Sequence, residues 1–283
     1  MSASDAPLSI GTVSLTVHDL HVTSRFYEQA IGMQPVSSEA GLRRLGTGDA
    51  VLLELRHDPQ ARRRSPREAG LFHTAFLLPD RADLGRWLKH AVEARLPLQG
   101  ASDHLVSEAI YLSDPEGNGI EVYADRPRSA WTVEGDMVAM STERLDVQDV
   151  IAEAGTTRWQ GYPAGGIVGH VHLQVGATEP ADAFFGGALG FDLTARYPGA
   201  SFYATGGYHH HLAANIWNSR GAGERDFPST GLAEVEMIAA DEEILAALRN
   251  RVQAAGVATT EKAGGFALHD PWGTSFSVIT RKG

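Results

Sequence analysis

The chain has 283 residues, 43% of them hydrophobic and 21% charged, as is typical of globular proteins. Its net charge of −11 argues against nucleic acid or an anionic membrane as a partner, and the absence of a long apolar run argues against a membrane span. Because there is no cysteine, any metal site must use carboxylates and some of the 12 histidines; we expect a cytoplasmic monomer or homo-oligomer.

The chain begins with an alternating strand that leads into an amphipathic helix ending near a glycine. The sequence of this segment is "IGTVSLTVHDLHVTSRFYEQAIGMQP" (10–35). A second copy, "VGHVHLQVGATEPADAFFGGALGFDL" (168–193), follows without a gap between matching positions. Two segments so far apart with the same pattern indicate an internal repeat.

A second repeat lies between and after these copies. Segment 70–124 starts "GLFHTAFLLPD" and ends "SDPEGNGIEVYA", while segment 231–280 starts "GLAEVEMIAAD" and ends "HDPWGTSFSVIT". Each predicts a strand, a helix (81–95 or 241–255), one or two strands, an Asp-Pro-x-Gly turn and a last strand. The chain therefore predicts four βαβββ units.

These units predict an α+β fold with a two-part organisation. A single unit exposes one face of a small sheet, so the units must pair into cups of curved sheet with flanking helices. The expected boundaries are 1–125 for two units (9–57 and 70–125), 126–166 for a connector rich in Pro, Gly and charge, and 167–283 for two more (167–220 and 231–281).

Four such units, together with "RFYEQAIGM", "ALGF" and "DPEGNGIEVYA", resemble the vicinal oxygen chelate superfamily of glyoxalases, bleomycin-resistance proteins and extradiol dioxygenases. The stretches "GASDHLVSEAIYLSDPEGNGIEVYADRP" and "GGYHHHLAANIW" are similar to its catechol-2,3-dioxygenase-like branch. The resemblance implies that metal ligands come from the first and last strands of a unit. It covers nearly the whole chain, but the superfamily hosts many reactions, so activity depends on the site residues.

The repeat register gives eight candidate positions. First strands offer Thr12, His73, His170 and Glu234, and last strands offer Glu54, Glu121, Asn215 and Ser277. Pairing unit one with two and three with four gathers no set of two histidines and a carboxylate. Pairing unit two with three gathers His73, Glu121 and His170, beside a neutral Asn215, and leaves a ligand-poor second cup. We therefore expect units two and three to share the metal cup.

Two histidines and one carboxylate form the facial triad of non-haem iron oxygenases, which leaves three metal positions open. The expected cofactor is Fe(II), with Mn(II) as the alternative. The resemblance then implies an extradiol ring-cleaving dioxygenase that uses O2 and a small aromatic diol of the catechol type, as in aromatic catabolism.

Further residues are candidates for catalysis. The resemblance places the acid/base at His210, after His209, whereas strand alternation from Asn215 favours His211. It also implies that Tyr111 contacts substrate and that His104 hydrogen-bonds substrate or a group behind the metal ligands. Tyr111, His104 and His172, two positions after His170, are equally compatible with a structural role, and the alternative for 209–211 is three exposed histidines on a loop.

Two other functions remain compatible with the sequence. A metal-dependent isomerase, lyase or thiol transferase of the glyoxalase type would use the same fold without O2. A non-enzymatic small-molecule-binding protein of the resistance type would lack metal, and the assembled triad argues against it.

Overall fold

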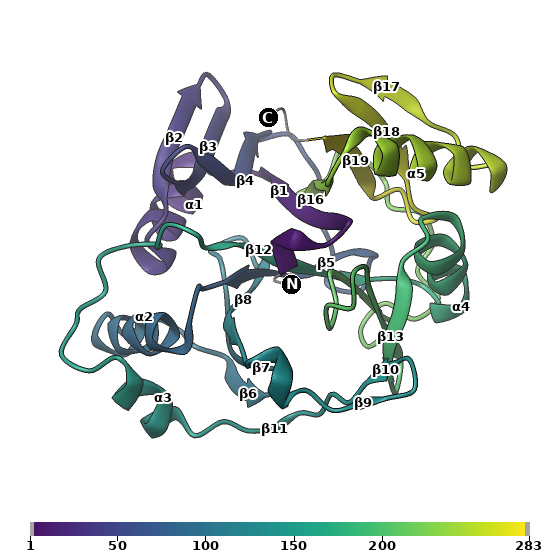
Figure 1. Cartoon of the computed structure of the whole chain (residues 1–283). Helices are drawn as coiled ribbons and strands as arrows, with labels where there is room; N and C mark the ends of the chain where they lie inside the picture. The colour runs from purple at the N-terminus through teal and green to yellow at the C-terminus, as the bar shows by residue number, and fades with distance from the viewer. Residues whose placement is uncertain (1–2, 281–283) are drawn as a thin grey trace.

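The computed structural model describes residues 3–280 and contains two large curved sheets that pack against each other (Figure 1). The first sheet has eight strands in the order β17-β18-β19-β16-β1-β4-β3-β2. Their bounds, in chain order, are β1 (Leu8–Val17), β2 (Gln34–Glu39), β3 (Leu42–Thr47), β4 (Ala50–His57), β16 (Gly231–Ala239), β17 (Thr260–Lys262), β18 (Gly265–His269) and β19 (Ser275–Thr280). This sheet combines the strands of the first and fourth repeats.

The second sheet has nine strands in the order β11-β6-β7-β8-β5-β12-β15-β14-β13. Their bounds are β5 (Gly70–Leu77), β6 (Gly100–Asp103), β7 (Ser107–Ser113), β8 (Gly119–Asp125), β11 (Glu143–Arg144), β12 (Ile167–Gln174), β13 (Asp192–Tyr197), β14 (Ala200–Ala204) and β15 (Leu212–Asn215). At its centre β5 pairs antiparallel with β12, so the strands of the second and third repeats form one continuous surface.

The helices flank the sheets, and apolar side chains of the long helices belong to the main core. The two long helices, α2 (Arg81–Glu93) and α5 (Glu242–Ala254), match the predicted ranges; both begin at an aspartate whose side chain accepts a main-chain N–H of the first turn. The short α1 (Leu20–Phe26) and α4 (Thr178–Ala181) each continue into a π-helical turn. None of the helices in residues 3–280 is long and apolar enough to cross a membrane.

The connector between the second and third repeats is more ordered than its composition suggests. It contains a small hairpin, β9 (Val133–Glu134) with β10 (Met137–Val138), and the helix α3 (Val147–Glu153), which packs beside α2. Strand β11 pairs with β6 at the sheet edge. Arg81 stabilises this arrangement through ion pairs to Glu108, Asp149 and Glu153. The connector therefore closes one side of the second sheet (Figure 1).

The main core lies between the two sheets, where β1 packs near β12 and β16 near β5. Along β12, Val171 and Leu173 belong to this core, so the alternation of a strand turns His170 and His172 to the opposite face. The described strands and helices confirm the predicted α+β fold class of βαβββ units. The fold thus leaves the outer, concave face of the second sheet free for a site.

Candidate metal centre

The sheet register brings three side chains to one point on the concave face. Ala75 on β5 pairs with Glu121 on β8 and with His170 on β12, so these residues form one row across the sheet. His73 lies two positions before Ala75 and therefore faces the same side. Register shifts just before His170 and just after His172 adjust the direction of β12 at this point.

The three side chains meet with their coordinating atoms in a small triangle. Glu121 Oε2 lies 3.0 Å from His73 Nε2 and 3.4 Å from His170 Nε2, and the two nitrogens are 3.3 Å apart. Ligand atoms about 2.1 Å from one ion and at right angles to each other are about 3.0 Å apart, so the triangle has the size of one face of an octahedral site.

Burial and charge also suit a divalent cation. Burial by itself raises the pKa of Glu121, but His170 and His73 hold that pKa well below its usual range, so the group is a carboxylate. Burial lowers the pKa of His170 to about 4, and its Nδ1 has no hydrogen-bond partner among residues 3–280. A neutral imidazole and a carboxylate are the forms that bind metal, so these residues fit a divalent metal ion.

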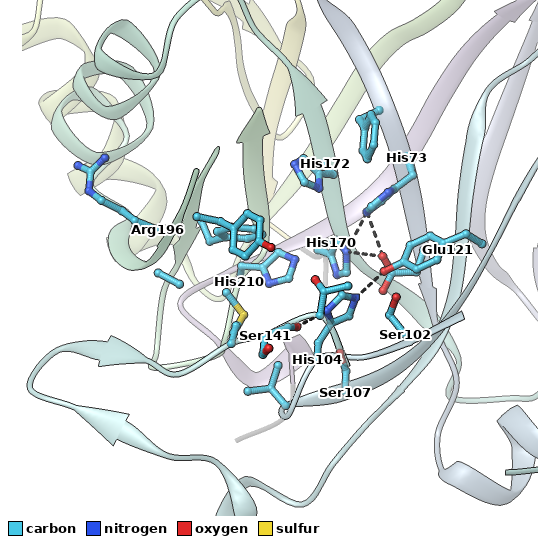
Figure 2. A pocket seen from close by; sticks show the side chains of 18 of the residues that line it. His73, Ser102, His104, Ser107, Glu121, Ser141, His170, His172, Arg196 and His210 are labelled. Atoms are coloured by element: carbon cyan, nitrogen blue, oxygen red, sulfur yellow. Dashed lines mark hydrogen bonds and ion pairs between the residues drawn. The ribbon is translucent and has the colours of Figure 1, made fainter. Parts of the chain in front are cut away.

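A cavity of about 330 Å³ lies over this triangle. Figure 2 shows the rings of His210 and His104 close to His170 and Glu121. The wall is mostly apolar and aromatic, and includes Phe72, Val106, Met140, Tyr197, Phe202 and Trp217. The volume is at the lower end of the range for small-molecule sites, so it suits a ligand of one or two rings.

Tyr111 stands directly opposite Glu121 in the β7–β8 hairpin and lines the cavity. His104 Nδ1 donates to the main-chain carbonyl of Ser141 at 2.7 Å, because a carbonyl can only accept. With the hydrogen of the ring on Nδ1, Nε2 accepts the hydrogen of the Tyr111 hydroxyl at 2.7 Å. Burial, and then the charge of Glu121, raise the pKa of Tyr111 well above its usual value, so Tyr111 is a neutral hydrogen-bond donor.

The three consecutive histidines lie in different surroundings. His210 lines the cavity, with its ring centre 4.1 Å from that of His170, whereas His211 points away and bonds to the carbonyl of Ala3. Strand alternation favoured His211, but β15 begins only at Leu212, and the turn that precedes it breaks the alternation. The resemblance was here the better guide to which histidine faces the cavity.

Two other candidate residues, Asn215 and His172, lie outside the ligand triangle. Asn215 pairs with Gln174, four residues beyond His170 on β12, and its amide oxygen accepts the N–H of Trp217 at 3.1 Å. It is outside the lining of the cavity, so a neutral fourth position beside the triangle is not what the structure shows. His172 lines the cavity among Phe72, Phe202 and Trp217, and burial lowers its pKa well below the usual value.

The second cup, which the first sheet forms, holds different side chains. Glu54 forms ion pairs of 2.8 Å with both Arg44 and Arg56, and Glu234 contacts Lys262 and accepts the Ser277 hydroxyl. Thr12 donates to the main-chain carbonyl of Val51. Among residues 3–280, the histidine and carboxylate group placed to hold a metal is the one in the second sheet.

Comparison with known proteins agrees with this geometry. The pattern of the Glyoxalase/Bleomycin resistance protein/Dioxygenase superfamily matches residues 9–122. Over 268 residues the chain is 41% identical to the catechol-2,3-dioxygenase of Bacillus subtilis strain 168, covering 93% of each protein. The chain belongs to this superfamily.

Solved structures support the same fold. Glyoxalase I from Zea mays superposes with a TM-score of 0.59 at 15% identity, covering 98% of this chain and 94% of the other. The cppA protein of Streptococcus pneumoniae superposes with a TM-score of 0.56 at 12% identity, covering 96% and 100%. Identities this low speak for the fold and not for the activity.

Proposed function

We propose that the chain is an extradiol ring-cleaving dioxygenase that inserts O2 into a catechol-type aromatic at an Fe(II) centre, with Mn(II) as the alternative ion. His73, Glu121 and His170 hold the metal in this proposal. The observation that carries it is the triangle of two imidazole nitrogens and one carboxylate oxygen on the wall of an aromatic cavity. The name of the Bacillus subtilis relative supports the same reaction.

When bound, the metal supplies a centre with open positions at which the diol oxygens and O2 meet. The chain supplies the rest. Phe72, Phe202 and Trp217 hold the aromatic ring of the substrate and exclude water. The hydrogen of the neutral Tyr111 hydroxyl is directed to His104, so its oxygen accepts a hydrogen bond from a substrate hydroxyl, and His104, fixed by Ser141, holds it in place.

His210 is the proposed acid/base, because among 209–211 it is the histidine that lines the cavity. Its ring accepts a proton from a diol hydroxyl and later returns a proton to the product. His211 is a structural residue in this proposal. A cytoplasmic location stays a prediction from the sequence, which leaves the choice between a monomer and a homo-oligomer open.

The test is O2 consumption by iron-loaded protein. The full chain, purified without oxygen and supplied with Fe(II), should consume one O2 per catechol and place both atoms of isotopically labelled O2 in a ring-opened product. The Glu121→Ala variant is the control and should consume none. Turnover of a thiol–aldehyde adduct without O2 uptake would instead identify a glyoxalase-type enzyme.

A further inference from the structure

A chain of hydrogen bonds runs from the sheet edge to His210. His209 is fully buried, and its Nδ1 lies 2.8 Å from Nδ1 of His210. On the other side of the ring, His209 Nε2 lies 2.9 Å from Oδ1 of Asp125, the last residue of β8. The Tyr208 hydroxyl donates to the same carboxylate oxygen at 3.1 Å, which holds the Asp125 side chain in place.

The donors and acceptors in this series of hydrogen bonds determine the direction in which each bond is donated. A carboxylate only accepts, so the hydrogen of His209 is on Nε2, facing Asp125. A neutral imidazole has one N–H, which leaves a lone pair on His209 Nδ1. Two nitrogens 2.8 Å apart share one hydrogen, and the N–H of His209 is already given to Asp125. The remaining bond must therefore be donated by Nδ1–H of His210.

We propose that Asp125 and His209 are positioning residues that fix the hydrogen of His210 on Nδ1 and keep Nε2 as a lone pair for the substrate. Among residues 3–280 no hydrogen bond to Nε2 is formed, and the ring lines the cavity (Figure 2). The catalytic part of this inference rests on the proposed function. There, Nε2 forms a bond to the hydrogen of a diol hydroxyl, the O–H bond breaks, and its electron pair stays on the diol oxygen.

The neighbouring His211 shows the opposite arrangement and serves as an internal reference. The main-chain N–H of Thr205 donates to its Nδ1 at 3.3 Å, and its Nε2 lies 3.0 Å from the carbonyl of Ala3. Because a carbonyl accepts, the hydrogen of His211 is on Nε2. Adjacent residues therefore carry their hydrogens on different ring nitrogens, each determined by its own partners.

Nitrogen NMR tests the placement directly, because protonated and lone-pair ring nitrogens have different chemical shifts. The experiment uses the full chain with labelled histidine, metal-free and loaded with diamagnetic Zn(II). In the wild type we expect the hydrogen of His210 on Nδ1 and that of His211 on Nε2. The Asp125→Asn variant offers an amide N–H to His209, so the hydrogen bonds can reverse their direction. The hydrogen of His210 then moves wholly or partly to Nε2.

Variants at His209 provide the matched pair. His209→Leu removes the acceptor and should leave His210 with a mixture of both forms, lowering kcat of ring cleavage about 10- to 100-fold with a smaller change in KM. His209→Asn places an amide oxygen where Nδ1 was and should restore the wild-type form and most of kcat. His211 should keep its hydrogen on Nε2 in every variant, which shows that the fold is intact.

Two results would overturn the inference. One is a wild-type His210 that carries its hydrogen on Nε2. The other is a His210 whose form is the same in the wild type, Asp125→Asn and His209→Leu. If the NMR result is as expected but the iron-loaded chain consumes no O2 with catechol, the hydrogen placement stands and the proposed function fails.

Discussion

His170 is the side chain on which the candidate centre depends, because it is the ligand that comes from the third repeat. Replacing His73, Glu121 or His170 by Ala should each lower bound metal from about one ion per chain to near zero, since two remaining ligands hold a divalent ion poorly against water. Elemental analysis after desalting measures this.

The matched control for these variants is His172→Phe. His172 is a buried histidine on the same strand and face as His170, yet it lies outside the ligand triangle. It should keep the metal content of the wild type. A loss of metal in His172→Phe equal to that in His170→Ala would show that a different set of histidines binds the ion.

His211 makes stability depend on pH. Burial lowers its pKa to about 4 in the folded chain, against an unfolded value of 6.5. Between these values the unfolded chain binds more protons, so the free energy of unfolding falls as pH is lowered from about 6.5 to 4, by up to about 3 kcal/mol from this residue.

Denaturant unfolding of the metal-free chain across this pH range measures the effect. His211→Asn keeps an acceptor for the Thr205 N–H but does not titrate, so its stability should depend less on pH, by about 1.4 kcal/mol per pH unit. The same change at the exposed His57 is the control. Equal slopes for the wild type and His211→Asn would show that His211 is not responsible.

At the scale of the element, β12 reaches its position because one of its residues has no side chain. A Cβ at Gly169 would lie 1.8 Å from the hydroxyl of Tyr123, which is fully buried and bonded to Tyr208 at 2.9 Å. Gly169→Ala should therefore displace β12 beside His170, costing about 1–3 kcal/mol of unfolding free energy and at least about tenfold in metal affinity.

Tyr123→Phe removes the nearest clashing atom, so it should recover part of the lost stability in the Gly169→Ala background. Gly223→Ala is the control, because a Cβ there has open space around it. Its unfolding free energy should change by less than about 0.5 kcal/mol. If both alanine variants have the stability of the wild type, the close approach to Tyr123 does not constrain β12.

Regular strands could be predicted from the sequence, whereas the packing of loops could not. The family resemblance pointed to the first and last strands, and the repeat register then selected His73, Glu121 and His170, because side-chain direction in regular strands follows from spacing. Irregular segments have no such period. The contact of His104 with Ser141, 37 residues further on, and the approach of His209 to Asp125 depend on how loops pack, so neither could be predicted.

The whole molecule has two cups, which differ in the charged side chains that pair with their carboxylates. In the first sheet Glu54 and Glu234 are already neutralised by Arg44, Arg56 and Lys262, and a cation there would have to replace those partners. Titration with Fe(II) or Mn(II) should therefore saturate at about one tightly held ion per chain.

Glu234→Gln should leave that stoichiometry unchanged, although it weakens the ion-pair network. A second equivalent of tightly held metal in the wild type, lost in Glu234→Gln, would show that the first sheet also binds an ion. Calorimetric titration and elemental analysis of the same samples distinguish these outcomes.

The way in which both ends of the chain contribute strands to each sheet also has an evolutionary consequence. Each sheet takes one repeat from before the connector and one from after it, and the candidate ligands are divided in the same way. A gene shortened to either half would encode two unpaired sheet edges and an incomplete ligand set. Selection that preserves the candidate centre therefore acts on both halves together, because neither half holds all three ligands.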